Sequence, residues 1–294
     1  MSQATVIYSH AALPLRAYLN PSAMVRNLWS VRVLTGQFAR RDIEQRYKNH
    51  LLGLAWTVIH PLIMLAVYTF VFGIVFEARR TAHGENAPTG GVDATFALNL
   101  FIGLIVFGIF REMAGAASNL IVGRTQYVKK VVVPLEIFSV SAMLVALFHF
   151  AVGLLVWFLG WVVFSPQHYP HWEVILVPVL ILPVCLAGLA MSWLLSALGV
   201  FLRDMGSIVE IGITMLFFLT PVFYSLDNIN NPKLRMVLGL NPLARSIESC
   251  RAVMIRGEQP DWAWWGGMLL VSALMAVLSY AMFMKCRRAF ADVL

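Results

Sequence analysis

The sequence has few charged residues and few cysteines for its length. Of its 294 residues, 13% are charged and 60% are hydrophobic, whereas soluble proteins carry roughly 25% charged residues. This composition excludes an ordinary soluble domain, and the mean hydropathy of +0.76 indicates a membrane protein. The cysteines Cys185, Cys250 and Cys286 fall in a predicted span, an outer loop and the inner tail, so we expect no intrachain disulfide and no metal site.

The sequence also lacks the motifs of enzymes. It contains no HExxH zinc helix, no GxSxG turn, no cluster of Cys and His, and no pair of carboxylates inside an apolar run. We therefore predict that the chain is not an enzyme and holds no cofactor. A GxxxxGK[ST] phosphate-binding loop is missing too, so active transport would need ATP hydrolysis by another chain or an ion gradient. Ion coupling favours carboxylates near the middle of the membrane, and none is convincingly placed there.

Apolar runs occupy most of the chain. A helix needs roughly 17–25 apolar residues to cross about 30 Å of hydrocarbon, and six runs approach or reach this length. The sequence therefore predicts an all-α polytopic membrane protein with six transmembrane helices, the second of which continues past its apolar run to Arg111 and Glu112. The predicted spans are Leu51–Phe76, Thr95–Phe110, Leu135–Phe164, Val174–Leu202, Ile208–Tyr224 and Trp262–Met284.

Basic residues are unequally divided between the two sides of these spans. No cleavable signal peptide precedes the first run, so we expect the N-terminus to stay inside. The inner segments then hold 15 Lys and Arg and the outer loops hold 7, in agreement with the positive-inside rule. We predict a cytoplasmic segment at 1–50, a six-span domain at 51–284 and a cytoplasmic tail at 285–294. The basic inner face suits anionic membrane lipids, so no nucleic acid is expected as a partner.

Two segments outside the spans have the pattern of amphipathic helices. Residues 24–40 form either an anchor at the inner interface or a contact surface for a partner. Residues 240–256, with Asn241 as N-cap, Pro242 in the first turn and Gly257 as the stop, either lie flat on the outer leaflet or dip into the membrane. The apolar stripes are Met24, Leu28, Val31, Leu34 and Phe38, then Leu240, Leu243, Ile247, Cys250 and Met254, whereas Arg245, Glu248, Arg251 and Arg256 lie off the second stripe.

A few ionisable residues fall inside the spans, where each is a functional hypothesis by default because charge is costly there. His60 and His149 either relay protons or hydrogen-bond to a neighbouring helix. Glu210, Arg111 and Glu112 lie near inner ends, where they reach water or a basic partner.

Aromatic side chains are plentiful in the first and fifth predicted spans. They either face lipid and neighbouring helices or line a path in which their rings stack on the C–H faces of sugars. The candidates for a substrate path are Trp56, Tyr68, Phe72, Phe217 and Tyr224.

Five sequence blocks occur in order over residues 25–285. In the first, "RRDIEQRYKNHLLGLAWTVIHPLIMLAVYTFVFGIVF", Arg41, Asp42, Arg46 and Tyr47 precede an L-G-x-x-W segment, a Pro-Leu pair and Phe-Gly. The others are "VKKVVVP" (Val128–Pro134), "FLRDM" (Phe201–Met205), "TPVFYS" (Thr220–Ser225) and "NPLARSIESCR" (Asn241–Arg251). Together these blocks resemble the membrane subunits of polysaccharide-exporting ABC transporters of the O-antigen or capsular type.

The resemblance implies a homodimer that works with two copies of an ATP-binding ABC subunit, which binds the ATP and Mg. It implies that the helix before the first span and the inner loop between spans two and three contact that subunit, that short gate helices dip back into the membrane before the last span, and that spans one and five line the pore. The coupling residues would be Arg40, Arg41, Tyr127, Lys129 and Lys130, and the gate residues Pro221, Asn241, Pro242 and Arg245.

The expected function is ATP-driven export of a lipid-linked polysaccharide, such as an O-antigen, across the bacterial inner membrane. Export of capsular polysaccharide or teichoic acid is the alternative within transport. A membrane assembly or scaffold protein without a transport path, and an ion-coupled carrier, are alternatives of other classes.

Overall fold

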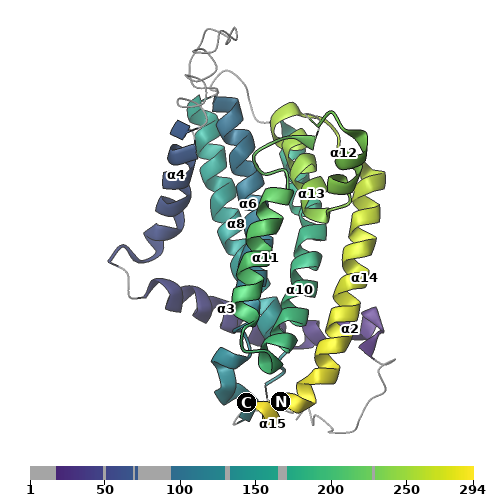
Figure 1. The fold of residues 1–294 in the computed structure, drawn as a ribbon. Coiled ribbons are helices and arrows are strands. Elements are labelled where there is room, and N and C mark those ends of the chain that lie inside the picture. Colours follow the sequence, from purple (N-terminus) through teal and green to yellow (C-terminus); the bar gives the residue numbers. More distant parts are fainter. Residues whose placement is uncertain are drawn as a thin grey trace, which may run out of the picture.

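The computed structural model describes residues 18–48, 51–68, 70–71, 94–129, 133–164, 171–226 and 229–294. Every regular element in these ranges is a helix, which confirms the all-α prediction. Figure 1 shows a bundle of upright helices with α2 (Pro21–Ser30) and α3 (Arg32–Tyr47) lying across one end. The helices α12 (Pro232–Gly239) and α13 (Pro242–Arg251) pack at the opposite end. We call these the α3 end and the α13 end.

Four stretches of helix within the described residues are long and apolar enough to cross a membrane. They correspond to the second, third, fourth and sixth predicted spans. The first and fifth predicted spans correspond to shorter apolar helices, and residues 72–76 of the first lie outside the described part of the chain. The helices are α4 (Trp56–Tyr68), α6 (Ala94–Ala117), α8 (Ile137–Phe164), α9 (Val177–Leu180), α10 (Leu182–Phe201), α11 (Met205–Leu219) and α14 (Trp262–Cys286).

Local sequence explains where several helices end. The fifth predicted span stops early because Thr220, which precedes Pro221, takes an extended conformation with ψ 138° instead of continuing α11. Asn241 caps α13 through its side chain, as predicted, and Pro242 stands in the first turn. A short π-helical turn, Ala252–Arg256, continues α13 until Gly257, whose φ of 65° ends it.

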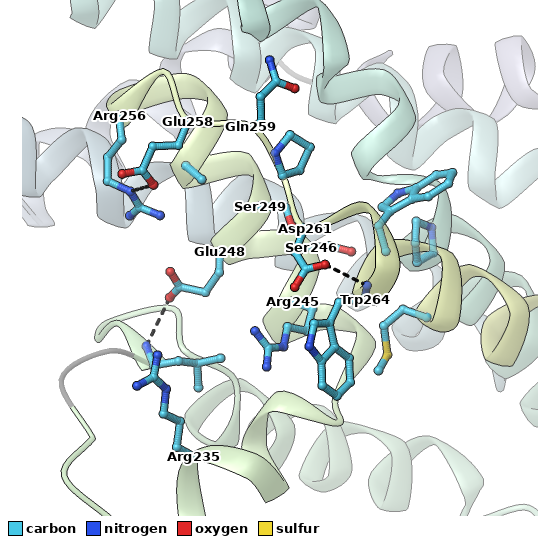
Figure 2. A pocket seen from close by; sticks show the side chains of 16 residues that line it. Arg235, Arg245, Ser246, Glu248, Ser249, Arg256, Glu258, Gln259, Asp261 and Trp264 are labelled. Carbon is cyan, nitrogen blue, oxygen red and sulfur yellow. Dashed lines mark hydrogen bonds and ion pairs between the residues drawn. The ribbon is translucent and has the colours of Figure 1, made fainter. Parts of the chain in front are cut away.

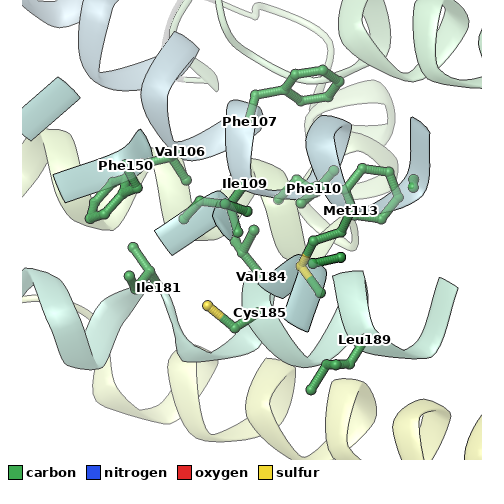
Figure 3. Close-up of a cluster of buried hydrophobic side chains, with 14 of the residues drawn as sticks. Val106, Phe107, Ile109, Phe110, Met113, Phe150, Ile181, Val184, Cys185 and Leu189 are labelled. Carbon is green, nitrogen blue, oxygen red and sulfur yellow. The ribbon is translucent and has the colours of Figure 1, made fainter. Parts of the chain in front are cut away.

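Helix α10 forms the centre of the bundle between α6 and α14. In Figure 3, Ile109 and Met113 of α6 meet Val184 and Cys185 of α10. On the opposite side, the rings of Trp193 and Tyr280 stand edge to face at 5.2 Å. Because lipid is as apolar as these side chains, close van der Waals packing, more than removal from water, holds such helices together.

Small residues permit this close packing. Gly188, Ser192 and Ser196, which follow one another every four residues along α10, are all buried. At Gly199, a Cβ atom would lie 2.4 Å from the backbone oxygen of Ser118. Any residue other than glycine would therefore clash at this position. The α6 and α10 backbones therefore approach closely at the α3 end of the bundle.

The two amphipathic patterns are largely confirmed. Met24 and Phe38 are buried at the ends of the first stripe, which bends at Val31 so that α2 and α3 are separate helices. In α13 and its continuation the stripe is also buried, except Leu240, which is 55% exposed. The pattern was wrong for Arg251. The helical spacing places this residue off the apolar stripe, where an exposed side chain is expected, but Arg251 is buried, with 4% of it exposed.

Candidate functional site

An ion pair at the α3 end joins α3 to the segment that follows α6. Nη2 of Arg124 donates to both carboxylate oxygens of Asp42 at 2.7 Å, and the Ser141 hydroxyl on α8 donates to the same carboxylate at 3.3 Å. The guanidinium also lies over the Phe138 ring, 4.7 Å from its centroid. Charge-assisted hydrogen bonds in a half-buried setting are stronger than exposed ion pairs, so this pair fixes the position of Arg124.

A second contact brings α3 to α7 (Thr125–Lys129). Nη1 of Arg41 donates to the Tyr127 hydroxyl at 2.8 Å. The Tyr127 ring packs edge to face against Phe38 at 5.4 Å and lies 5.8 Å from Phe138. The short helix α7 is therefore held to α3 by both polar and aromatic contacts.

A third contact reaches into the bundle. Arg46 pairs with Glu112 of α6, and Glu112 accepts a hydrogen bond from Nδ1 of His149 at 2.7 Å. A carboxylate only accepts, so Nδ1 of His149 carries a proton, and in the neutral ring Nε2 accepts from the Tyr47 hydroxyl at 2.9 Å. Burial raises the pKa of the Tyr47 hydroxyl, which keeps this donor protonated. We call the contacts of Arg41, Asp42, Arg46 and Tyr47 the α3 network.

This network shows the partners of two residues, Glu112 and His149, whose roles the sequence left open. His149 hydrogen-bonds to neighbouring helices, which is the structural interpretation given for it above. Glu112 and His149 are 37 positions apart, so no local spacing could pair them, and sequence patterns gave no interacting partner for Asp42, Arg46, Tyr47 or Arg124. The R-D-x-x-x-R-Y block was the available signal.

Two further predicted coupling residues, Arg40 and Lys129, lie at the α3 end. Arg40 is exposed and forms an exposed ion pair with Glu44, four residues on, which contributes little stability. Lys129 is exposed at the end of α7. Lys130 lies outside the described residues, so its role stays a prediction.

The predicted path residues divide into exposed and packed rings. Trp56 is 37% exposed, whereas Phe217 packs against Phe107 of α6 at 5.1 Å and against Phe223 at 5.0 Å. Its neighbour Phe218 is 64% exposed and was not among the candidates. Tyr68 and Tyr224 make contacts where α11 ends: the Tyr68 ring lies edge to face with the Phe223 ring, 6.2 Å between centroids, and the Tyr224 hydroxyl donates to the Leu219 oxygen at 3.2 Å. Phe72 lies outside the described residues.

A buried arginine organises the α13 end. Arg251 donates to the carbonyl oxygens of Val222 at 2.6 Å, Pro221 at 2.8 Å and Tyr224 at 3.0 Å. Its Nε donates to the oxygen of Asn99 in α6 at 3.1 Å, so one side chain ties α13 to two spans. The break in α11 at Pro221 frees the carbonyl groups that Arg251 uses.

Other polar contacts hold the same region. Glu248 pairs with Arg251 at 3.1 Å and accepts from the Leu226 amide at 3.3 Å. The Asn241 side chain donates to the Thr220 hydroxyl at 3.1 Å while capping α13. The predicted gate residues Pro221 and Asn241 therefore lie together where the segment after α11 meets α13, and their action as a gate stays a prediction.

No group of three or more His, Cys, Asp or Glu side chains in the described ranges could hold a metal ion. The geometry is that of a polytopic membrane protein whose polar contacts gather at its two ends. The sequence matches the family described as "ABC-2 type transporter" over residues 34–255, and the protein belongs to this family of membrane transport proteins.

Two relatives of known name match nearly the whole chain. The protein is 28% identical over 271 residues to the O-antigen export system permease protein RfbA of Myxococcus xanthus, an alignment that covers 92% of this chain and 98% of the relative. It is 25% identical over 256 residues to the protein of the same name from Klebsiella pneumoniae, covering 86% of this chain and 92% of the relative. The resemblance seen in the sequence blocks is confirmed.

Proposed function

We propose that the chain is the transmembrane subunit of an ATP-driven exporter that moves a lipid-linked polysaccharide, of the O-antigen type, across the bacterial inner membrane. The full-length similarity to two O-antigen export permeases carries this proposal. The two shorter apolar helices complete a six-span topology with both termini in the cytoplasm. Two copies of the chain form the pore, with α4 and α11 lining it, and gate helices α12 and α13 close its outer side.

The ATP is hydrolysed by a separate ABC subunit, present in two copies, which binds ATP and Mg. This follows from the family and from the absence of a phosphate-binding loop in the sequence. The α3 network supports a coupling role for the α3 end: it joins α3, the segment from Arg124 to Lys129, α6 and α8. A displacement of α3 or α7 would therefore move the two spans α6 and α8 together with them.

Deletion of the gene in its native host tests the function. We expect surface polysaccharide to be lost while lipid-linked polysaccharide accumulates inside the cell, because synthesis precedes export. Expression of the intact chain restores the surface polymer, and in a strain that also lacks the ATP-binding subunit only the two chains together restore it. A strain that stops making the polymer, instead of accumulating it, contradicts export and favours an assembly or scaffold role.

The identity of the accumulated polymer decides between O-antigen and the alternative substrates. Accumulated chains that become attached to the lipopolysaccharide core after complementation identify an O-antigen. Chains that appear as capsule, or that carry a polyol-phosphate backbone, identify the capsular or teichoic acid alternative.

A further inference from the structure

A hollow of about 200 Å³ opens at the α13 end between α12, α13 and the start of α14. Figure 2 shows Arg235 of α12, Arg245 and Glu248 of α13, and Trp264 of α14 around it. These side chains come from three separate elements, so only the tertiary structure brings them together. The volume is below the roughly 300–1,000 Å³ of sites for drug-sized ligands, which suits a ligand of about one ring.

The acidic side chains of the hollow are already engaged by the protein. Glu258 pairs with Arg256 at 2.7 Å, and Glu248 pairs with the buried Arg251 at 3.1 Å. Asp261 caps α14 by accepting from the backbone amides of its first turn. None of these carboxylates therefore leaves a strong uncompensated negative charge in the hollow.

The guanidinium group of Arg245 is held in place while its two terminal nitrogens remain available to a ligand. Its guanidinium carbon lies 4.6 Å from the centroid of the Trp264 ring, and its Nε donates to the Gly239 oxygen at 3.3 Å. Within the described ranges, its two terminal nitrogens make no further hydrogen bond. A positioned planar donor beside a Trp ring that is 39% exposed is prepared for a ligand that combines polar groups with an apolar face.

The balance of charge decides the class of ligand. The side chains that line the hollow are balanced, three arginines against three carboxylates, whereas a site for a free phosphate or an anionic head group gathers basic donors without acidic neighbours. An acyl chain would leave these polar groups unpaired, which is costly. A sugar ring supplies hydroxyl groups that both donate and accept, and its C–H face contacts an aromatic ring.

We propose that this hollow binds one sugar unit of the exported chain on the outer side of the membrane, with Trp264 and Arg245 as its main contacts. The inference rests on the proposed export function. A weak outer site of this kind holds the emerging polymer between transport steps and opposes its return.

Photo-cross-linking in the complete exporter tests the site. A benzophenone amino acid replaces Trp264 or, as a second variant, the exposed Gln259 at the rim of the hollow; the control position is Leu270, which is 73% exposed further along α14. We expect ultraviolet light to give a ladder of high-mass adducts at positions 264 and 259 but not at 270. The ladder should vanish in a strain that cannot synthesise the polysaccharide.

A further substitution measures the contact itself. Arg245→Ala should lower the yield from position 259 by about tenfold, the loss expected when a charged hydrogen-bond donor is removed. Cells that export polysaccharide normally through the variants but give no ladder at 264 or 259 contradict the sugar site while leaving the export function intact. A single low-mass adduct that persists without polysaccharide synthesis identifies a membrane lipid and overturns the proposal. Export that does not depend on the chain at all contradicts the proposed function itself.

Discussion

Nη2 of Arg124 lies 2.7 Å from each carboxylate oxygen of Asp42, although the two residues are 82 positions apart. This pair connects the transverse helix α3 with the loop between α6 and α8. Both side chains are about one-fifth exposed, so the pair is shielded from solvent screening on most sides. Because Arg41 and Tyr127 form a second contact, α3 is joined at two points to the segment from Arg124 to Tyr127.

The Asp42 and Arg124 pair should behave as a coupled unit. We expect Asp42→Asn or Arg124→Gln to lower the stability of the purified protein by about 1.5–3 kcal/mol, the range for hydrogen bonds to charged groups, and to reduce ATP-dependent export. The double variant should cost less than the sum of the single variants, as measured by thermal unfolding in detergent. Strict additivity would show that the two side chains do not interact.

Removing the Arg251 side chain should disrupt the α13 end. Arg251→Met leaves Glu248 buried without its partner and leaves several carbonyl groups without a donor, so we expect a loss of about 3–5 kcal/mol. Arg256→Met is the matched control, since its side chain is 41% exposed. The measurement is the melting temperature of each variant, and equal melting temperatures would contradict the role given to Arg251.

Alanine substitutions at two glycines of α6 should change the stability of the protein in opposite directions. A Cβ at Gly103 would lie 2.9 Å from Nη2 of Arg251 and 3.1 Å from the Val222 oxygen, whereas Gly108 has nothing within 4 Å. Gly103→Ala should therefore destabilise the protein by about 1–3 kcal/mol, while Gly108→Ala should stabilise α6 by about 0.4–1 kcal/mol. Thermal unfolding of both variants checks this, and destabilisation by Gly108→Ala would show that its surroundings are filled.

The exposed aromatic rings should matter for export more than the packed ring. Leucine keeps hydrophobicity while removing the aromatic face, so Trp56→Leu and Phe218→Leu should reduce surface polysaccharide at matched protein levels without loss of stability. Phe217→Leu, which removes ring contacts with Phe107 and Phe223, should mainly lower the melting temperature. Full export by the Trp56 and Phe218 variants would show that these rings face lipid or a neighbouring chain.

The three free cysteines should differ in their reactivity with a maleimide, and labelling of Cys286 should report the side of the membrane on which it lies. Cys185 and Cys250 are buried, and Cys286 is half-buried near the end of α14, so a maleimide should label Cys286 first. With the proposed topology, a membrane-impermeant maleimide labels it in inside-out vesicles but not in intact cells, and Cys286→Ser abolishes the signal. Labelling in intact cells would reverse the orientation of the chain.

Sequence patterns were enough to predict the all-helical class, four of the spans, both amphipathic segments and several helix ends. These features depend on neighbouring residues: an apolar run long enough to cross lipid, an Asn that caps α13 and a Gly that ends the turn after α13. The first and fifth spans were harder because the described helices are shorter than the apolar runs that predicted them.

Which polar residues contact one another depends on how the helices pack. Spacing left Arg251 off the apolar stripe of α13, yet it is buried because the chain folds back so that carbonyl groups freed at Pro221 surround it. Glu112 and His149 lie on different helices, and Asp42 and Arg124 are 82 positions apart. Periodicity records which face of a helix is apolar, whereas the partner of a buried charge depends on how distant helices pack, since a charge is stable there only where donors and acceptors converge.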